Sequence, residues 1–395
     1  MTISGKMSKL GTETAFDVLA RAAALSAAGM DVINLGIGQP DFPTPPHIVE
    51  AGIQALKDGH HGYTAATGIL PLREAVAADI KKYRQVDVSP DNILIMPGGK
   101  LTMSFAIEMF GEDGAEILYP NPGFPIYESM IRYSGATPVP IPLLEENGFS
   151  FDADHVLSLI TDKTRLLILN TPANPTGGVV PTSELAKLAA GLAKHPDVYI
   201  LSDEIYSRMT YDGLAHCSML SFPDLRERLI LLDGWSKTYA MTGWRLGWGL
   251  WPEHLVQIAT RLCVNYHSCV NASAQYAGIA ALTGDQSAVD DMMSAFDQRR
   301  HLIHDRLNQI NGISCTLPKG AFYAFANIRQ TGLTSRQFQD QLLQQEGIAT
   351  IAGTSFGADG EGYLRFSYAN SMDNINRAMD RLQNFTKNFT AKSGY

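Results

Sequence analysis

The sequence has few cysteines, and they form no recognisable pattern. Four cysteines among 395 residues show no Cys-x-x-Cys spacing, which argues against a disulfide framework and against a zinc ribbon. Cys263 and Cys269 flank His267, but small buried thiols explain such cysteines better than a metal site. We therefore expect reduced thiols and no bound metal.

Long apolar runs and basic runs are also missing. No uninterrupted apolar stretch approaches the roughly 20 residues of a membrane span, and Met1–Phe16 lacks the apolar core of a signal peptide. The formal net charge is −9 and no basic block occurs, which disfavours nucleic acid as a partner. We expect a soluble, cytoplasmic protein with no membrane and no nucleic-acid partner.

Short apolar strands alternate with helical patterns from about residue 47. The segments between the strands are mostly long enough for crossover helices, which favours an α/β domain with a largely parallel sheet covered on both faces. Ligands of such sheets bind outside the carboxyl ends of the strands. The expected strands are Ile93–Met96, Ala115–Tyr119, Leu166–Asn170, Val198–Ser202, Leu229–Leu232 and Leu246–Leu250.

The character of the sequence changes near residue 285. A long polar helix, Asp285–Gln309, precedes a shorter strand-and-helix region. At the other end of the chain, an alanine- and leucine-rich helix over Thr14–Met30 is followed by Pro40–Pro46, which breaks regular structure. We predict a large domain over 47–284 and a smaller domain built from 1–46 and 285–395.

The most informative stretch runs from Gly234 to Gly247 (GWSKTYAMTGWRLG). It places Lys237 just after an apolar strand, where lost hydration favours the neutral amine that forms a Schiff base with an aldehyde. Arg245 and the nearby hydroxyls suit a phosphate group. Together these residues predict a covalent site for pyridoxal phosphate.

The same stretch resembles the cofactor-attachment signature of class I/II aminotransferases, with Trp235 bulkier than the residue usual at its position. Motifs in family order extend the resemblance from Phe16 to Tyr368. The resemblance is to the aspartate, aromatic and broad-specificity group. It implies a fold-type I pyridoxal-phosphate-dependent transferase, whose large domain has a mostly parallel mixed sheet flanked by helices and whose smaller domain is α+β.

Asp203 lies at a strand end in the sequence Ser202-Asp203-Glu204-Ile205-Tyr206. A buried aspartate needs a cationic partner such as a protonated pyridinium, but an aspartate between strand and helix suits a helix N-cap equally well. The sequence resembles the family's Asp-Glu-x-Tyr motif. The resemblance implies that Asp203 pairs with the ring nitrogen of the cofactor and that Tyr206 donates to its phenolic oxygen.

Two proline-containing turns follow other predicted strands. Asn174 lies in TPANPTG, a rigid turn that resembles the family's Asn-Pro-Thr-Gly loop, in which the asparagine amide faces the phenolic oxygen and the substrate. Phe124 lies in NPGFPIY, where family members place an aromatic ring that stacks on the pyridine. Aspartate-specific members have tryptophan there, and Phe124 lacks its N–H donor, which weakens an inference of strict aspartate specificity.

Gly98-Gly99-Lys100 precedes the helical pattern Leu101–Phe110. Glycines at a helix N-terminus let backbone amides approach an anion, with help from the helix dipole. The order of motifs resembles the family's phosphate cup, which implies backbone contacts from Gly99 and Lys100, completed by Ser236 and Arg245. Lys100 departs from the small residue often found at its position.

Three further residues are implied by resemblance. Tyr63, in a Tyr-x-x-x-x-Gly-x-x-x-Leu-Arg stretch, corresponds to a tyrosine that reaches the phosphate of the neighbouring subunit, which implies a homodimer with a shared active site. Arg365 corresponds to the arginine that binds the substrate α-carboxylate through two parallel hydrogen bonds. Gly38 lies in the loop that adds a backbone contact to the same carboxylate.

The resemblance implies an enzyme that moves an amino group from an L-amino acid to a 2-oxo acid by a ping-pong mechanism through a Lys237 aldimine, with Lys237, Asp203 and Tyr206 as catalytic residues. A lyase that cleaves β or γ bonds remains open because it needs the same lysine and aspartate. The acidic charge disfavours a DNA-binding regulator built on the same scaffold. A nicotinamide-dependent dehydrogenase is disfavoured because its third glycine is missing after Gly36-x-Gly38.

The side chain of the amino donor is harder to predict. The resemblance implies that part of its pocket comes from the partner subunit, from the segment before the helix near Gln275. That segment, Val264–Cys269, contains no arginine or lysine to pair with a second carboxylate, although Arg261 is near. The hypothesis is a broad or neutral/aromatic specificity.

Overall fold

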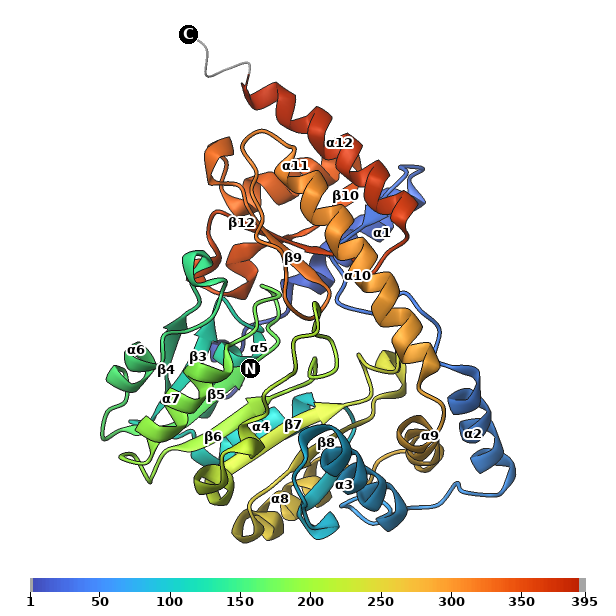
Figure 1. Cartoon of the computed structure of the whole chain (residues 1–395), viewed down its shortest axis with the longest axis vertical. Coiled ribbons are helices and arrows are strands. Elements are labelled where there is room, and N and C mark those ends of the chain that lie inside the picture. Colours follow the sequence, from blue (N-terminus) through green and yellow to red (C-terminus); the bar gives the residue numbers. More distant parts are fainter. Residues whose placement is uncertain (1–2, 391–395) are drawn as a thin grey trace.

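The centre of the protein is a mixed seven-stranded sheet (Figure 1). It is seen in a computed structural model that describes residues 3–390, with side chains as far as residue 387. The strand order is β2 (Ile93–Met96), β8 (Gly247–Leu250), β7 (Leu229–Gly234), β6 (Tyr199–Asp203), β5 (Thr164–Asn170), β3 (Glu116–Asn121) and β4 (Thr137–Pro142). The strands from β7 to β4 run parallel, whereas β8 is antiparallel to both of its neighbours.

Helices cover both faces of this sheet because its strands are apolar on both sides. One face packs against α4 (Lys100–Phe110), α5 (Ile126–Ser134) and α8 (Glu253–Tyr266). The other face packs against α3 (Leu70–Arg84), α6 (Ala153–Ser158), α7 (Thr182–Leu192) and α9 (Ala272–Thr283), and α2 (Pro46–Lys57) lies on α9. The result is a three-layer α/β arrangement that leaves the carboxyl ends of the parallel strands open.

A second, three-stranded antiparallel sheet faces those open strand ends (Figure 1). Its order is β11 (Ile351–Ala352), β12 (Tyr363–Ser367) and β9 (Tyr323–Asn327). The core on this side contains Phe296, Phe338 and Phe366. Its helices are α10 (Ser287–Asn308), α11 (Ser335–Glu346) and α12 (Met372–Thr390).

The beginning of the chain joins this second part. After α1 (Thr14–Ala27), the short strand β1 (Ile33–Asn34) pairs in parallel with β10 (Ile348–Ala349). Segments more than 300 residues apart in sequence therefore share one small sheet. Short 3₁₀ turns complete the secondary structure at Gly5–Lys9, Pro90–Asn92, Glu145–Asn147, Met219–Ser221, Pro223–Arg228, Thr242–Trp244, Arg329–Thr331, Gly353–Phe356 and Ala358–Gly360.

All predicted strands are present, within about two residues of their expected bounds, which is the ordinary uncertainty of element ends. The strand β4 was not among the predicted strands, because three of its six residues are prolines. Prolines lack the N–H that a central strand needs, but β4 is an edge strand paired only with β3, where they are tolerated. The first helix ends at Ala27 and not at Met30, because Gly29 adopts a positive φ of 94°.

Within residues 3–390, no helix is long and apolar enough to span a membrane.

Candidate active site

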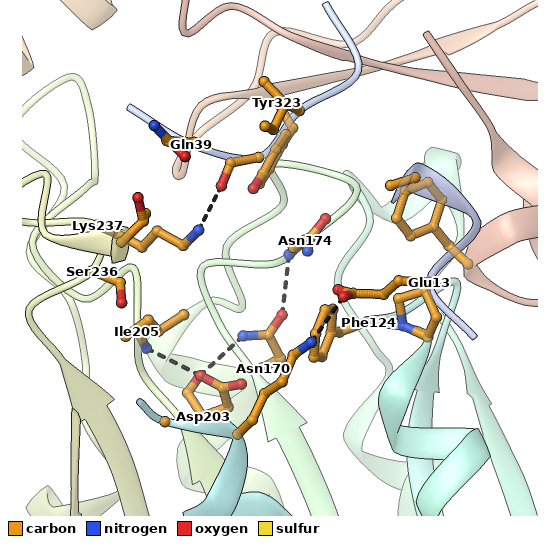
Figure 2. Close-up of a pocket in the computed structure, with 18 of the residues that line it drawn as sticks. Glu13, Gln39, Phe124, Asn170, Asn174, Asp203, Ile205, Ser236, Lys237 and Tyr323 are labelled. Atoms are coloured by element: carbon orange, nitrogen blue, oxygen red, sulfur yellow. Dashed lines mark hydrogen bonds and ion pairs between the residues drawn. The ribbon is translucent and has the colours of Figure 1, made fainter. Parts of the chain in front are cut away.

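A cavity of about 620 Å³ opens between the carboxyl ends of the main sheet and the second sheet (Figure 2). It brings together residues that the sequence spreads over more than 300 positions. Every predicted site residue except Tyr63 lines it: Gly38, Gly99, Lys100, Phe124, Asn174, Asp203, Tyr206, Ser236, Lys237, Arg245 and Arg365.

Lys237 follows β7 and points into this cavity. Its Nζ donates a 2.6 Å hydrogen bond to the backbone oxygen of Gly38 (Figure 2). Burial lowers the pKa of Lys237 to about 8, and the positive charge of Arg365 acts in the same direction. A substantial fraction of neutral amine is therefore available near neutral pH, as a nucleophile toward an aldehyde requires.

Asp203 ends the neighbouring strand β6 and faces the same cavity. Burial raises its pKa to about 6, and the hydrogen bond from Tyr127 opposes that rise. The Tyr127 hydroxyl donates to Oδ2 at 2.6 Å, and the backbone N–H of Ile205 donates to Oδ1 at 3.2 Å. Above pH 6 the cavity thus holds a buried carboxylate that a cationic ligand would stabilise.

Asn174 is held in place by the preceding turn. The side chain of Asn170 donates to the backbone oxygen of Asp203 at 3.1 Å and accepts from the backbone N–H of Asn174 at 3.0 Å (Figure 2). The turn after β5 is therefore tied to the end of β6. These hydrogen bonds place Asn174, which follows β5, over Asp203, which ends β6.

Arg365 projects from β12 across the cavity. It donates to Asn174 Oδ1 at 2.8 Å and to the backbone oxygen of Gly36 at 2.6 Å. Its side chain lies 4.6 Å from the ring centre of Tyr323 and 4.7 Å from that of Phe356. The buried Nε has no hydrogen-bond partner, so the guanidinium keeps a free donor for an anionic ligand such as a carboxylate.

A second anion-binding corner lies at the start of α4. Gly98 adopts a φ of 92°, and a Cβ there would lie 2.3 Å from Arg245 Nη2, so glycine lets the guanidinium approach the backbone. Arg245 itself has a positive φ of 54° and donates to the backbone oxygen of Thr242 at 2.9 Å. With Ser236 and the helix N-terminus beside it, this corner suits a phosphate group.

Lys100 is already paired. Its ammonium lies 2.8 Å from Glu13 Oε2, at the start of α1, and 5.3 Å from the ring centre of Phe124 (Figure 2). The ion pair joins the N-terminal segment to α4 across the mouth of the cavity. Glu13 was not among the predicted site residues. Its partner, Lys100, lies 87 positions away, and no local sequence pattern indicates the contact.

Tyr206 also has a partner that the sequence does not reveal. Its hydroxyl lies 2.7 Å from the hydroxyl of Tyr323 on β9. The same tyrosine explains Gly38, because a Cβ at that position would lie 2.5 Å from the Tyr323 hydroxyl. Tyr127 has a weak sequence signal, since it follows Phe124 by three residues and so lies on the same side of the start of α5. Tyr323 has none.

Tyr63 lies outside the cavity and is 94% exposed. Within one chain, the structure does not bring it to the other predicted residues. Its expected role toward a neighbouring subunit remains a prediction.

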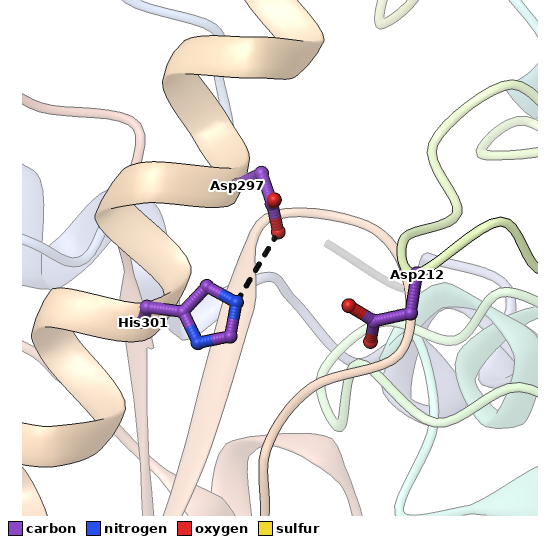
Figure 3. Close-up of side chains that lie close together, drawn as sticks. All are labelled: Asp212, Asp297 and His301. Atoms are coloured by element: carbon purple, nitrogen blue, oxygen red, sulfur yellow. Dashed lines mark ion pairs between the residues drawn. The ribbon is translucent and has the colours of Figure 1, made fainter.

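One cluster of potential metal ligands lies elsewhere, formed by Asp212, Asp297 and His301 (Figure 3). The guanidinium of Arg300 occupies the space between the two carboxylates, with Nη2 2.7 Å from Asp212 and 2.6 Å from Asp297. A fixed cation thus already balances these charges. The cluster is an ion-pair network between α10 and the loop that contains Asp212.

The depressed pKa of Lys237 gives a direct prediction for the cofactor-free protein. Labelling of Lys237 with formaldehyde and cyanoborohydride should reach half its maximal rate near pH 8 and decline as the pH falls below that value, because protonation removes the nucleophile. Peptide mass spectrometry measures the profile. Lys187 is the internal control, since its hydrogen bond to Asp154 raises its pKa. Identical profiles for the two lysines would contradict the prediction.

Known proteins resemble this chain along most of its length. Residues 30–382 match the family model for aminotransferase class I and II. The chain is 39% identical to aspartate aminotransferase of Pyrococcus abyssi and 40% identical to aromatic-amino-acid aminotransferase 2 of Thermococcus litoralis, covering 90% of this chain and 92% of the relative in both cases. Alanine aminotransferase from Pyrococcus furiosus has a similar structure, with a TM-score of 0.92, 32% identity, and coverage of 98% of this chain and 100% of that one. The chain therefore belongs to the class I and II aminotransferases, enzymes that depend on pyridoxal 5'-phosphate, and it has their fold-type I architecture.

Proposed function

We propose that this aminotransferase moves the amino group of an L-amino acid to a 2-oxo acid in two half-reactions of a ping-pong cycle, with Lys237 forming the Schiff base to the cofactor. One observation carries the proposal. A lysine with a pKa lowered to about 8 and an aspartate with a pKa raised to about 6 are buried in the same cavity. Such a pair suits a site that must hold both a reactive amine and a carboxylate counter-ion at neutral pH.

The residues fit pyridoxal phosphate at each of its chemical groups. Lys237 suits the aldehyde, and the carboxylate of Asp203 suits a protonated ring nitrogen. The corner formed by Gly98, Gly99 and Arg245 suits the phosphate, and a Cβ at Gly98 would collide with the Arg245 guanidinium. When bound, the cofactor supplies an electron-withdrawing ring that stabilises negative charge on the substrate Cα.

The remaining chemistry falls to side chains of this chain. Once the substrate amine had taken the place of Lys237, the freed amine would accept the proton from the substrate Cα and deliver it to the aldehyde carbon of the cofactor, as general base and then general acid. Asp203 would accept a hydrogen bond from the ring N–H and keep that nitrogen protonated, and Tyr206 would donate to the phenolic oxygen. Arg365, with its free Nε donor, binds the substrate α-carboxylate beside Asn174.

A half-reaction without any 2-oxo acid tests this proposal. Adding a single amino acid donor to the purified protein with pyridoxal phosphate should replace the yellow absorbance of the Lys237 Schiff base with that of the amine form, and release one equivalent of 2-oxo acid. Lys237→Ala should lose turnover by a factor of about 10⁴ or more, because both the attachment point and the proton carrier are gone.

Two other results would redirect the proposal. A band that persists while ammonia accumulates would identify a lyase on the same scaffold. Normal turnover by Lys237→Ala, or no visible band after addition of pyridoxal phosphate, would contradict it.

The donor side chain is proposed to be neutral or aromatic. Large apolar residues line the cavity, including Phe16, Phe124 and Phe356. Arg365, beside Phe356, is proposed to bind the α-carboxylate, and Lys100, beside Phe124, is neutralised by Glu13 at 2.8 Å. A substrate with a second carboxylate would have to approach Glu13, which like-charge repulsion disfavours. The relatives do not decide the point, because their names include aspartate, aromatic-amino-acid and alanine aminotransferases.

Glu13→Gln should therefore improve the use of aspartate relative to phenylalanine. Removing the carboxylate frees Lys100 for a second substrate carboxylate, and we expect the ratio of kcat/KM values to rise about 3- to 10-fold. Steady-state kinetics with aspartate, alanine, phenylalanine and methionine measure the ratio. In the matched control, Glu13→Gln with Lys100→Met, the gain should disappear. An unchanged ratio in the single variant would contradict the role of the ion pair.

The protein is proposed to act as a homodimer whose subunits share active sites. Tyr63 is 94% exposed, and other apolar side chains are exposed nearby in the sequence, on α2 and at the start of α3: Ile53, Leu56 and Leu70. Burying them against a second copy would be favourable and would give Tyr63 a site to reach.

We also propose the division into a large domain over 47–284 and a small domain from 1–46 and 285–395. Residues 1–2 and 391–395 of that division lie outside the described residues.

Mixed dimers test the shared site. Tyr63→Ala and Lys237→Ala subunits are each expected to be impaired, Tyr63→Ala through weaker cofactor binding and Lys237→Ala through lost chemistry. Co-refolding or co-expression should restore about a quarter of the parent activity at low cofactor concentration, because half of the subunits form mixed dimers with one intact site each. Activity no greater than that of the two separate variants would contradict a shared site.

A further inference from the structure

Arg84 lies behind the cavity, at the end of α3, and touches the ends of both strands that carry the reactive pair. Its side chain is only 4% exposed. Nε donates to Glu204 Oε2 at 2.8 Å, and Nη2 donates to Asp233 Oδ2 at 2.5 Å. One planar guanidinium therefore bridges two carboxylates that come from different strands.

The strand register explains why these two carboxylates meet. Asp203 on β6 lies opposite Leu232 on β7, and both line the cavity. Side chains alternate between the two faces of a sheet, so the next residues, Glu204 and Asp233, point to the opposite face. The backbone N–H of Glu204 still bonds the oxygen of Leu232 at 2.9 Å, which keeps the strand ends together. Arg84 binds this pair of carboxylates on the face of the sheet opposite the cavity.

The two carboxylates are thus adjacent in sequence to the site residues. Glu204 directly follows Asp203, and Asp233 precedes Lys237 by four residues at the start of its turn. Arg84 also lies 5.6 Å from the ring centre of Trp248, which pairs with Asp233 from β8. A shift of the guanidinium would therefore move the supports of both reactive groups.

The charges behind the sheet are balanced through Arg84. Burial opposes ionisation of Glu204, but His216 at 3.0 Å and Arg84 outweigh it and hold the pKa of Glu204 at about 2. Burial raises the pKa of Asp79 to about 6 and also raises that of Asp233. The other charged or titratable groups near this cluster are Lys82, Tyr83, Asp203, Arg208 and Tyr239. Without Arg84, the potential at Asp203 and at the Schiff base would become more negative.

We propose that Arg84 is a positioning residue of the cofactor site, which holds the ends of β6 and β7 together from behind and thereby fixes Asp203 and Lys237 relative to each other. The inference rests on the proposed function, in which these two residues contact the cofactor. Arg84 contacts neither the cavity nor its ligands. It acts only through the two strands and through its charge.

Two variants separate its geometry from its charge. Arg84→Lys keeps the charge but loses the planar fork, and Arg84→Met loses both.

Arg228→Met is the matched control, because Arg228 is also buried and lies at the opposite end of β7. Its hydrogen bonds go to the backbone oxygens of Leu192, His195 and Val198. Three properties are measured on each holoenzyme: kcat and KM of the half-reaction, the pH midpoint of the visible Schiff-base band, and the dissociation constant of pyridoxal phosphate from titration of the cofactor-free protein.

Arg84→Met should lower kcat about 100-fold while KM changes less than about threefold, because misplacing a reactive group by an ångström costs that much. Its visible-band midpoint should rise by about one pH unit, because losing a nearby positive charge favours the protonated form. Its cofactor dissociation constant should rise about tenfold. Arg84→Lys should keep the parent midpoint but lose about tenfold in kcat. Arg228→Met should lose thermal stability while all three properties stay near those of the parent.

Parent-like values of kcat, midpoint and dissociation constant in both Arg84 variants would overturn the proposal. If Arg84→Met does not fold, a parent-like kcat in Arg84→Lys overturns it by itself. Equal losses in the Arg84 variants and in Arg228→Met would also overturn it, since they would show a general stability effect. A parent protein that binds no pyridoxal phosphate would instead refute the proposed function.

Discussion

The pairing of β6 with β7 is the constraint on which this site depends. These neighbouring parallel strands end at the same edge of the sheet, and one carries Asp203 while the other leads into Lys237. Burying an ionised side chain costs several kcal/mol, so a cavity with both groups is stable only where partners compensate. Tyr127 and the Ile205 N–H compensate Asp203, and Gly38 accepts from Lys237. The incomplete compensation is what moves both pKa values toward neutrality.

The side chains at the ends of β6 and β7 have different roles on the two faces of the sheet. The cavity face presents the groups proposed to contact the cofactor and substrate, and the opposite face holds the buried ion pairs of Arg84. A buried ion pair adds little net stability, because desolvation offsets the attraction. Its value here is geometric, since a fork-shaped donor allows only a narrow range of positions for the two carboxylates. The two ion pairs of Arg84 explain how a site with several buried charges keeps one arrangement.

The cavity is also a junction between distant parts of the chain. Arg365 reaches from β12 to Asn174 in the large sheet, and Glu13 reaches from α1 to Lys100. In the proposed function, a substrate carboxylate would compete with the first of these contacts and a charged donor side chain with the second. Substrate binding would then be coupled to how the N-terminal and C-terminal segments sit on the main sheet.

The sequence by itself determined the fold class, six of the seven strands of the main sheet, and eleven of the residues that line the cavity. Apolar runs mark buried strands, and the groups that follow them must gather at one sheet edge, so Lys237, Asp203 and Asn174 could be found without coordinates. It could not give β4, whose prolines are tolerated only because it lies at an edge. Nor could it give Tyr323, Glu13 or Arg84, and its signal for Tyr127 was weak, because the importance of these residues comes from partners that lie 76 to 149 residues away. Tertiary structure alone decided these contacts and the pKa values that follow from them, since burial and the distance between charges exist only once the chain has folded.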